Sequence, residues 1–292
     1  ADISPTFISK RRLKVGTFKV VANGLRLGER FLKIIFDNAI ANKVDEIYVT
    51  IFDRTDEQRR LINLLTDWGF VKFGIKQGVS GDELVYTRDM RPSFNSSNPK
   101  LTFPYFPRTG RSFLVPIYPD YHTELLPDSI LRTENPCDFV DHAPHRNAIS
   151  KVYISRSFER NLRRGDRIIF YRTKAPDGNA YHTSVISTVG IIEDVIKNIP
   201  NETTFISVCR RRSVFSDEEL RKHWNFNPQN RPFVVNFLCV YSFPKRVNLE
   251  WLINNRIIAN IDTVPRGFTQ ITDAQFETIL KGTQTDESFI VD

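Results

Sequence analysis

The chain has 292 residues, and its 41 lysines and arginines outnumber its 34 aspartates and glutamates, which gives a net charge of +7 and an isoelectric point near 9.3. This length suffices for about two domains that each bury a core, and the widely separated Cys137, Cys209 and Cys239 exclude a disulfide scaffold or a paired zinc motif. No stretch reaches the roughly 18 apolar residues of a membrane-spanning helix and no secretion signal opens the chain, so we expect a cytoplasmic protein whose basic charge favours a polyanionic partner.

The first part of the chain, residues 1–90, has the pattern of an α/β module. Residues 13–21 alternate loosely between apolar and polar side chains, residues 27–41 repeat apolar side chains at helical spacing, and residues 46–52 form a β-branched and aromatic run. The order strand, helix, strand predicts a right-handed βαβ unit with parallel strands.

A second helix and a hairpin close this module. Thr55 and Gln58 have the spacing of a capping box in front of an apolar helical repeat, and Gly69 stands where a C-terminal glycine ends a helix. Residues 71–75 and 83–88 then predict an antiparallel hairpin.

A glycine-containing turn, Asn23 to Gly28, precedes the first helix, and the second helix ends in Trp68, Gly69 and Phe70. These motifs resemble the GCN5-related N-acetyltransferases (GNAT) over about residues 11–89. The resemblance implies a partial GNAT-like mixed sheet with helices, in which backbone N–H groups at a helix N-terminus hold the pyrophosphate of acetyl-coenzyme A. The cofactor-binding residues that it implies are Gly24, Leu25, Arg26, Leu27, Gly28 and Glu29.

The acid of the family's reaction is missing from this module. Leu65 stands where the family has a tyrosine that protonates the leaving thiolate, and the strands that shape the acceptor site have no room before Leu13. We therefore expect a degenerate acyltransferase scaffold and assign no catalytic residue. The alternative is a coenzyme A-dependent N-acetyltransferase that acts on an RNA-linked or other amine.

Residues 91–146 are rich in proline, serine, asparagine and aromatic residues, which indicates a connector that docks on a module through its apolar run Phe113 to Tyr118. The strand at residues 13–21 has an exposed edge in this scheme, and such edges are usually covered. We expect a homodimer or an upstream domain to cover it, because Pro116 and Pro119 interrupt the ladder that the connector could offer.

The remainder, residues 147–292, contains many short strand-like runs and few helices, which predicts an α+β module with a small mixed β-barrel. Strands are expected at residues 151–154, 166–172, 184–192, 203–210 and 234–241, and helices at residues 217–224, 249–255 and 273–280.

Basic residues are concentrated at the start of this module. Between Arg146 and Lys174 the chain has nine lysines and arginines against two acids, an excess equal to the net charge of the whole chain. Gly165 and Asp166, within this range, predict a tight turn, and Ile168 to Phe170 after it are expected in the barrel core.

This run, residues 155–172, and the glycine in the later strand at Gly190 resemble the PUA-like superfamily of the ASCH and EVE type over about residues 147–283. The resemblance implies recognition of RNA, or of a modified base, between a helix and the barrel. The planar guanidinium group of arginine is suited to binding phosphate, and aromatic side chains are suited to stacking on bases. The candidate nucleic-acid-binding residues are Arg156, Arg160, Arg163, Arg164, Arg167, Tyr171, Arg172, Tyr181 and Trp224, with Tyr153 as a further ring.

Other readings of the basic run stay open. A basic helix face is commonly a solvated surface, and an acidic protein could also bind it. Three consecutive arginines, residues 210–212, form a second basic cluster at an expected strand end. His142 and His145 have metal-ligand spacing, but Pro144 interrupts the helical turn that would present them, so we expect no metal site. The expected function is nucleic-acid binding, of RNA before DNA, in a toxin–antitoxin or defence setting.

Overall fold

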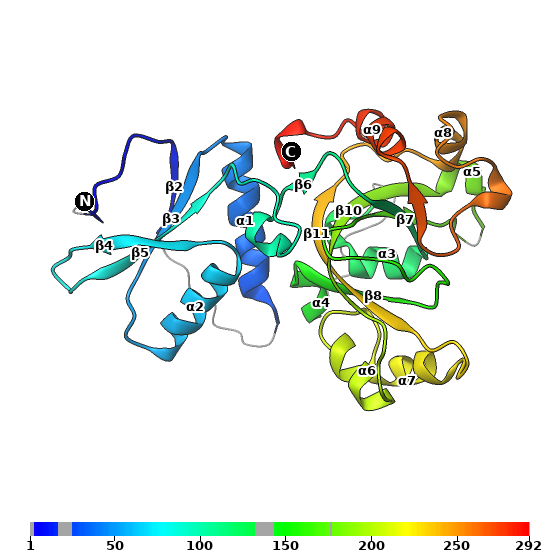
Figure 1. The fold of residues 1–292 in the computed structure, drawn as a ribbon, viewed down its shortest axis with the longest axis horizontal. Coiled ribbons are helices and arrows are strands. Elements are labelled where there is room, and N and C mark those ends of the chain that lie inside the picture. Colours follow the sequence, from blue (N-terminus) through cyan, green and yellow to red (C-terminus); the bar gives the residue numbers. More distant parts are fainter. Residues whose placement is uncertain (1–2, 17–24, 132–142, 176, 292) are drawn as a thin grey trace.

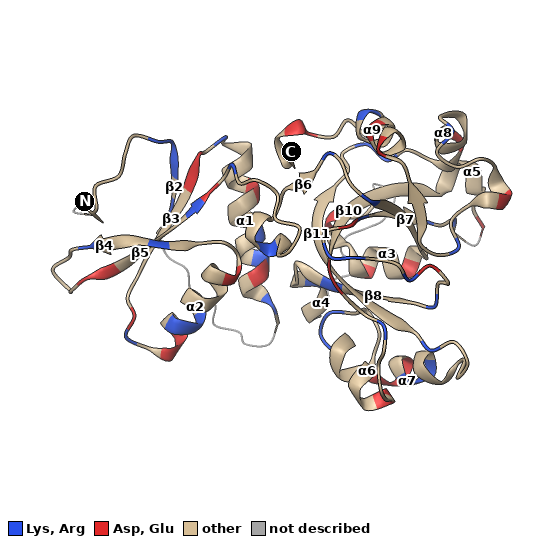
Figure 2. Ribbon diagram, in the orientation of Figure 1, with Lys and Arg blue, Asp and Glu red and all other residues tan. Residues whose placement is uncertain are grey.

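The computed structural model describes residues 3–16, 25–131, 143–175 and 177–291. The chain forms two modules side by side, each built on its own sheet, and helix α1 lies between the first sheet and the second module (Figure 1). Basic and acidic residues are spread over both modules (Figure 2). Within the described ranges, no helix combines the length and apolar character needed to cross a membrane.

The first module is a five-stranded sheet in the order β1-β4-β5-β3-β2, with β2 and β3 parallel and the other pairs antiparallel. The predicted strand–helix–strand order with parallel strands and the closing antiparallel hairpin are therefore confirmed. The elements are β1 (Ile3–Ser4), β2 (Arg12–Val15), α1 (Leu27–Ala41), β3 (Glu46–Ile51), α2 (Asp56–Asp67), β4 (Val71–Lys76) and β5 (Glu83–Asp89).

Both long helices of this module begin and end as the sequence predicts. The Thr55 hydroxyl accepts a hydrogen bond from Gln58 N and the Gln58 side chain accepts one from Thr55 N, so the capping box is complete. Gly69 adopts a left-handed φ of 82°, which ends α2 at little conformational cost. Helix α1 buries Leu32, Phe36 and their neighbours against the sheet.

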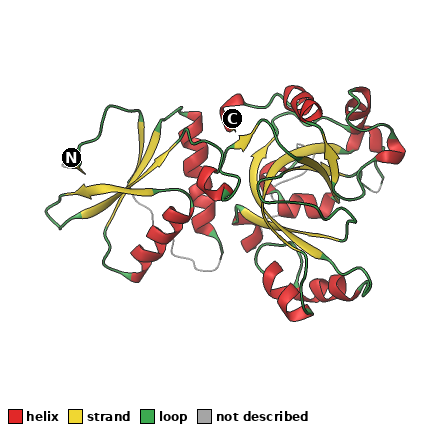
Figure 3. Cartoon of the chain, viewed as in Figure 1, coloured by secondary structure: helices red, strands yellow, loops and turns green. Residues whose placement is uncertain are grey.

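The second module is a six-stranded sheet in the order β12-β7-β9-β10-β11-β8, and this sheet curls into a partly closed barrel flanked by helices (Figure 3). Strand β7, next to the short edge strand β12, meets the other edge strand, β8, where the Tyr153 hydroxyl donates to Pro116 O over 2.6 Å. Ile168, Ile169 and Phe170 are fully buried, as predicted. The elements are β7 (Ser112–Ile117), β8 (Ser150–Ser155), β9 (Arg167–Arg172), α5 (Ala180–Thr183), β10 (Val185–Ile196), α6 (Glu202–Cys209), α7 (Asp217–Asn225), β11 (Phe233–Ser242), α8 (Leu249–Asn254), β12 (Thr269–Ile271) and α9 (Asp273–Gly282).

The strand predicted at residues 203–210 is wrong, because this segment forms α6. The Asn201 side chain caps the helix by accepting from Thr204 N at 2.9 Å, and Phe205, Ile206 and Cys209 share one buried helical face. The arginine cluster at residues 210–212 therefore follows the end of a helix and not the end of a strand.

The expected connector contributes a strand to the second sheet. Strand β7 pairs in parallel with β9 along its whole length, Pro116 lying opposite Tyr171. The prediction that Pro116 interrupts the ladder of this segment is wrong, because the β7–β9 pairing continues past it. On the opposite side of β7, strand β12 pairs only with Ser112, Phe113 and Leu114, so Pro116 has no neighbouring strand there that needs its missing N–H. The rest of this stretch forms β6 (Phe106–Pro107), α3 (Pro119–Leu125), α4 (Pro144–Asn147) and 3-10 turns at Pro99–Thr102 and Pro127–Ser129.

The two modules are joined by a polar contact as well as by a shared apolar core. The buried Glu29 carboxylate, in the first turn of α1, accepts from Ile149 N at 2.9 Å and from Ser150 N at 3.2 Å at the start of β8. At the C-terminal end, β13 (Ile290–Val291) pairs in parallel with β6. Strand β2 pairs with β3 alone among the described residues, and most of the predicted strand at residues 13–21 lies outside them.

Candidate functional site

The basic run between β8 and β9 forms a loop in place of the expected helix. Ser157 N donates to the Ser155 hydroxyl, Glu159 N to the Ser157 hydroxyl, and Asn161 N to the Glu159 carboxylate at 2.6 Å. Side chains that bond the backbone two residues onward compete with helical hydrogen bonds, which explains the missing helix. Leu162 is buried in the barrel interior and anchors the loop.

Three loops meet here. The β8–β9 loop contacts the α7–β11 loop, because Asn230 Nδ2 donates to Arg156 O at 3.1 Å. It also contacts the segment before β12, where Phe268 N donates to the Ser157 hydroxyl. We call the accessible part of these loops the arginine–phenylalanine surface. It consists of the exposed Phe158, Arg163, Phe226 and Arg266 and the half-buried Arg156, Arg160 and Arg231.

Three arginines of this surface are fixed against aromatic rings. The guanidinium carbon of Arg156 lies 5.0 Å from the Phe226 ring centre, and that of Arg231 lies 4.8 Å from the Trp224 ring. Arg160 is likewise 4.9 Å from the ring of Phe233. Ring faces attract cations and limit the motion of the side chains.

The hydrogen bonds of these arginines go to neutral oxygens. Arg156 donates to His223 O, Arg231 to Trp224 O, and Arg160 to Asn230 Oδ1 at 2.7 Å. Arg163 and Arg266 are exposed. Among the described residues none of the five forms an ion pair with a carboxylate, so their charges remain to attract an anion.

Two phenylalanines stand out from the same loops. Phe158 is 96% exposed and Phe226 is 79% exposed. The Phe158 backbone is held by the hydrogen bonds of Ser157 and Glu159 on either side. The surface therefore combines arginines that form no ion pair with any described carboxylate and two exposed aromatic rings.

The remaining sequence-predicted residues lie elsewhere. Arg167 is fully buried, Tyr171 and Arg172 are buried in β9, and Trp224 is 7% exposed beneath Arg231. Arg164 is exposed but is bonded to the connector, where it donates to Ser97 O at 3.0 Å.

Tyr181 is exposed at the opposite end of the barrel. It lies in α5, which follows β9, whereas the arginine–phenylalanine surface precedes β9. A strand of six residues spans about 20 Å, so Tyr181 cannot contact the same short segment of ligand. Tyr153, in β8, points toward Phe170 and Phe268 in the barrel.

Sequence reasoning missed Phe158, Phe226, Arg231 and Arg266. Phe226 is followed by Asn227 and Pro228, a loop signal that could have marked the ring as exposed. Phe158 carried no such signal, because an aromatic residue beside Ser157 and Glu159 also fits a half-buried helix.

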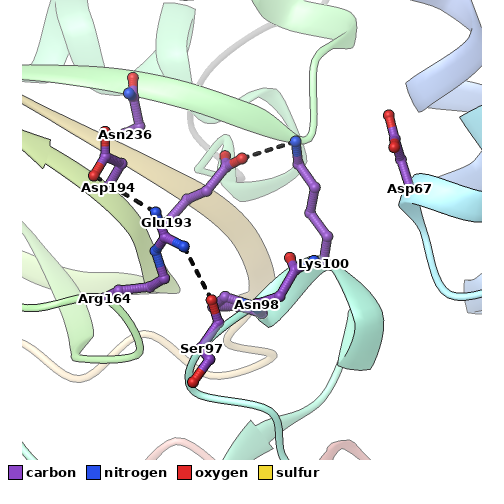
Figure 4. Close-up of a pocket in the computed structure, with 9 residues that line it drawn as sticks. Asp67, Ser97, Asn98, Lys100, Arg164, Glu193, Asp194 and Asn236 are labelled. Atoms are coloured by element: carbon purple, nitrogen blue, oxygen red, sulfur yellow. Dashed lines mark hydrogen bonds and ion pairs between the residues drawn. The ribbon is translucent and has the colours of Figure 1, made fainter.

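A cavity of about 530 Å3 lies between the modules, and Figure 4 shows its polar side chains. Its two cations are already paired: Lys100 Nζ lies 2.8 Å from Glu193, and Arg164 lies 3.8 Å from Asp194. Burial raises the pKa of Glu193, but hydrogen bonds from Lys100 and Ser150 outweigh burial and lower it overall. With Asp67 added, the lining carries an excess of negative charge and disfavours phosphate.

The first turn of α1, expected to bind coenzyme A, faces the second module. Besides its backbone contacts, Glu29 lies 3.2 Å from Arg26 and 3.5 Å from Arg212, and Asn147 donates to Leu25 O at 3.0 Å. Gly28 lies against Leu64: a Cβ there would stand 3.0 Å from the Leu64 side chain. Gly24 lies outside the described residues.

A second polar cluster is buried beside the barrel. His122 Nε2 lies 2.8 Å from the Ser187 hydroxyl, and the Ser129 hydroxyl lies 2.6 Å from that of Thr188 and 2.7 Å from that of Ser242. Burial, followed by the charges of Arg172 and Arg246, lowers the pKa of His122 to about 3, so the imidazole is neutral.

No group of three or more histidine, cysteine, aspartate or glutamate side chains within the described ranges is arranged to hold a metal ion. His145 lies 3.4 Å from Glu124 instead, and Lys151 donates to its carbonyl oxygen at 2.5 Å. His142 lies outside those ranges.

The fold and the site define a mixed α/β protein with a barrel-like module that carries an exposed arginine–phenylalanine surface. No protein-family model matches the chain, and no curated protein matches it. One similar solved structure is that of human THYN1 in complex with DNA containing 5-methylcytosine, with 12% sequence identity and a TM-score of 0.34. The match covers 61% of this chain and 99% of THYN1. Likeness of this degree assigns no function.

Proposed function

We propose that this protein binds nucleic acid through the arginine–phenylalanine surface. The observation that supports the proposal is the group of five arginines, contributed by three loops, none of which forms an ion pair with a carboxylate of the described residues. Phosphate contacts of this kind release counterions and supply most of the affinity of non-specific nucleic-acid binding.

RNA is the proposed nucleic acid. Loops with exposed rings suit the unpaired bases that folded RNA presents, whereas reading duplex DNA usually requires a helix or a two-stranded ribbon in the major groove. The second module is proposed to be PUA-like, in keeping with the curled sheet and the Gly165 turn, whose φ is 85°.

The first module is proposed to be a scaffold without acyl transfer. A coenzyme A pyrophosphate at the first turn of α1 would meet the Glu29 carboxylate and the start of β8, which already occupy this position. Leu65 is fully buried and offers no proton.

Fluorescence anisotropy with a labelled RNA strand of about 20 nucleotides tests the proposal. Arg163→Glu and Arg266→Glu are expected to weaken binding by about tenfold each, and to reduce the slope of affinity against salt by about one ion per residue. Arg60→Glu, at an exposed position on α2, makes the same charge change on the other module and is expected to leave affinity within about twofold.

Equal weakening by all three variants would show that net charge alone attracts RNA, and would contradict a defined surface. Affinity that does not change with salt would contradict the phosphate contacts themselves.

A further inference from the structure

We infer that the arginine–phenylalanine surface selects single-stranded over double-stranded nucleic acid, by stacking unpaired bases on Phe158 and Phe226. This inference rests on the proposed function and deepens it, since phosphate contacts alone do not distinguish the two forms.

Phe158 is a prepared stacking face. The residue is 96% exposed, yet its backbone is held by the hydrogen bonds from Ser157 N to the Ser155 hydroxyl and from Glu159 N to the Ser157 hydroxyl. A ring on a fixed loop loses little conformational entropy when a base covers it.

Phe226 is prepared in a different way. The Arg156 guanidinium lies over the ring at 5.0 Å and is held by a hydrogen bond to His223 O, while 79% of the residue remains exposed. A base that stacks on this ring also brings its phosphate close to Arg156, so one nucleotide satisfies both kinds of group.

Charge complementarity identifies the occupant. Isolated exposed apolar residues are ordinary, but these two rings lie among arginines that form no ion pair within the described ranges, and a polyanion with aromatic faces matches both features. In a duplex the base faces are covered by neighbouring bases, so only phosphates would reach the surface.

The test compares three probes of equal length: a single-stranded oligouridylate, an abasic strand with the same phosphates, and an RNA duplex. The variants are Phe158→Ala and Phe226→Ala, with Phe158→Leu to retain apolar area without a ring. The control is Tyr118→Ala, which removes a 68% exposed ring outside the surface.

We expect each alanine variant to weaken oligouridylate binding by about tenfold, with the leucine variant close to alanine, while abasic-strand and duplex binding stay within about twofold. Tyr118→Ala is expected to leave all three probes unchanged. Unchanged thermal unfolding of the variants would show that the loops stay folded.

Two failures are distinguishable. If the phenylalanine variants bind oligouridylate as the parent chain does, while Arg163→Glu still weakens binding, the stacking inference is wrong and the phosphate surface stands. If the parent chain binds none of the three probes, the proposed function is wrong and the inference falls with it.

Discussion

Asn230 holds Arg160 in place: the Arg160 guanidinium donates to Asn230 Oδ1 over 2.7 Å, while Asn230 Nδ2 donates to Arg156 O over 3.1 Å. One amide side chain thus connects a side chain and a backbone carbonyl of the same loop. Because this loop has no helical hydrogen bonds, Asn230 provides part of the order that a helix would have supplied.

Replacing Asn230 should disturb binding through positioning. Asn230→Ala removes both bonds and is expected to weaken RNA binding by about tenfold and to lower the free energy of unfolding by about 1–2 kcal/mol. Anisotropy and denaturant titration measure the two effects. Gln229→Ala, at the exposed neighbouring position, is the control. Unchanged affinity with a full loss of stability would limit Asn230 to a structural role.

The buried His122 should make stability sensitive to acid. Its pKa is about 3 in the folded chain, whereas an unfolded histidine titrates near 6.5. Between these values the unfolded chain binds one more proton, so the free energy of unfolding falls as pH decreases, by about 1.4 kcal/mol per pH unit.

His122→Gln removes this titration and can still bond the Ser187 hydroxyl. Stability measured from about pH 4 to pH 6 is expected to depend on pH less steeply than in the parent chain, by about one proton. The same substitution at exposed His182 controls for the loss of an imidazole. If the free energy of unfolding depended on pH equally in His122→Gln and in the parent chain, the imidazole would bind its proton over the same pH range in the folded and the unfolded chain, which would contradict the low pKa.

The contact between the modules should depend on Glu29. Glu29→Ala leaves Ile149 N and Ser150 N without their acceptor and Arg212 without its carboxylate, so we expect a loss of about 3 kcal/mol in the free energy of unfolding. Glu29→Gln keeps an acceptor oxygen and should cost less. Chemical denaturation measures both, with Asp82→Ala, at an exposed carboxylate, as control. A loss below about 1 kcal/mol would mean that water replaces the carboxylate.

The sequence predicted those features of the fold that depend on residues close together in the chain. The capping box at Thr55, the glycine end of α2 and the βαβ order depend on residues close in sequence, and the structure confirms them. Strand β7 could not be recognised from its own residues, because a proline is tolerated in it only beyond the end of its neighbour β12. Strand β12 lies about 150 positions later in the sequence. The helix at α6 was missed because its few apolar residues fit either period.

The site was harder to predict than the fold. Arginine count pointed to the loop that carries the proposed surface but could not separate buried from exposed members, since Arg163 and Arg167 differ only in which side of the Gly165 turn they occupy. Phe226 and Arg231 come from a loop about 70 residues further along the chain, and the β8–β11 pairing and the Asn230–Arg156 hydrogen bond bring them beside the basic run. Such proximity is a property of topology and leaves no local trace in the sequence.

Arg167 belongs to the core, whereas Arg163 is exposed. Its guanidinium is fully buried, donates to Pro107 O at 2.8 Å and to Gly110 O, and lies 2.7 Å from the Asp273 carboxylate. It thereby fastens α9 to the turn before β7.

Replacement by lysine should therefore have different effects on stability and RNA binding at Arg167 and at Arg163. A lysine cannot reproduce the planar fork that reaches several oxygens, so Arg167→Lys is expected to lower the free energy of unfolding by about 3 kcal/mol and to leave RNA affinity unchanged below the melting temperature. Arg163→Lys should leave stability unchanged within about 0.5 kcal/mol and weaken RNA binding only slightly, because the phosphate contact keeps its charge. Thermal unfolding and anisotropy on both variants check this. A tenfold loss of affinity in Arg167→Lys at unchanged stability would return this residue to the binding surface and remove it from the core.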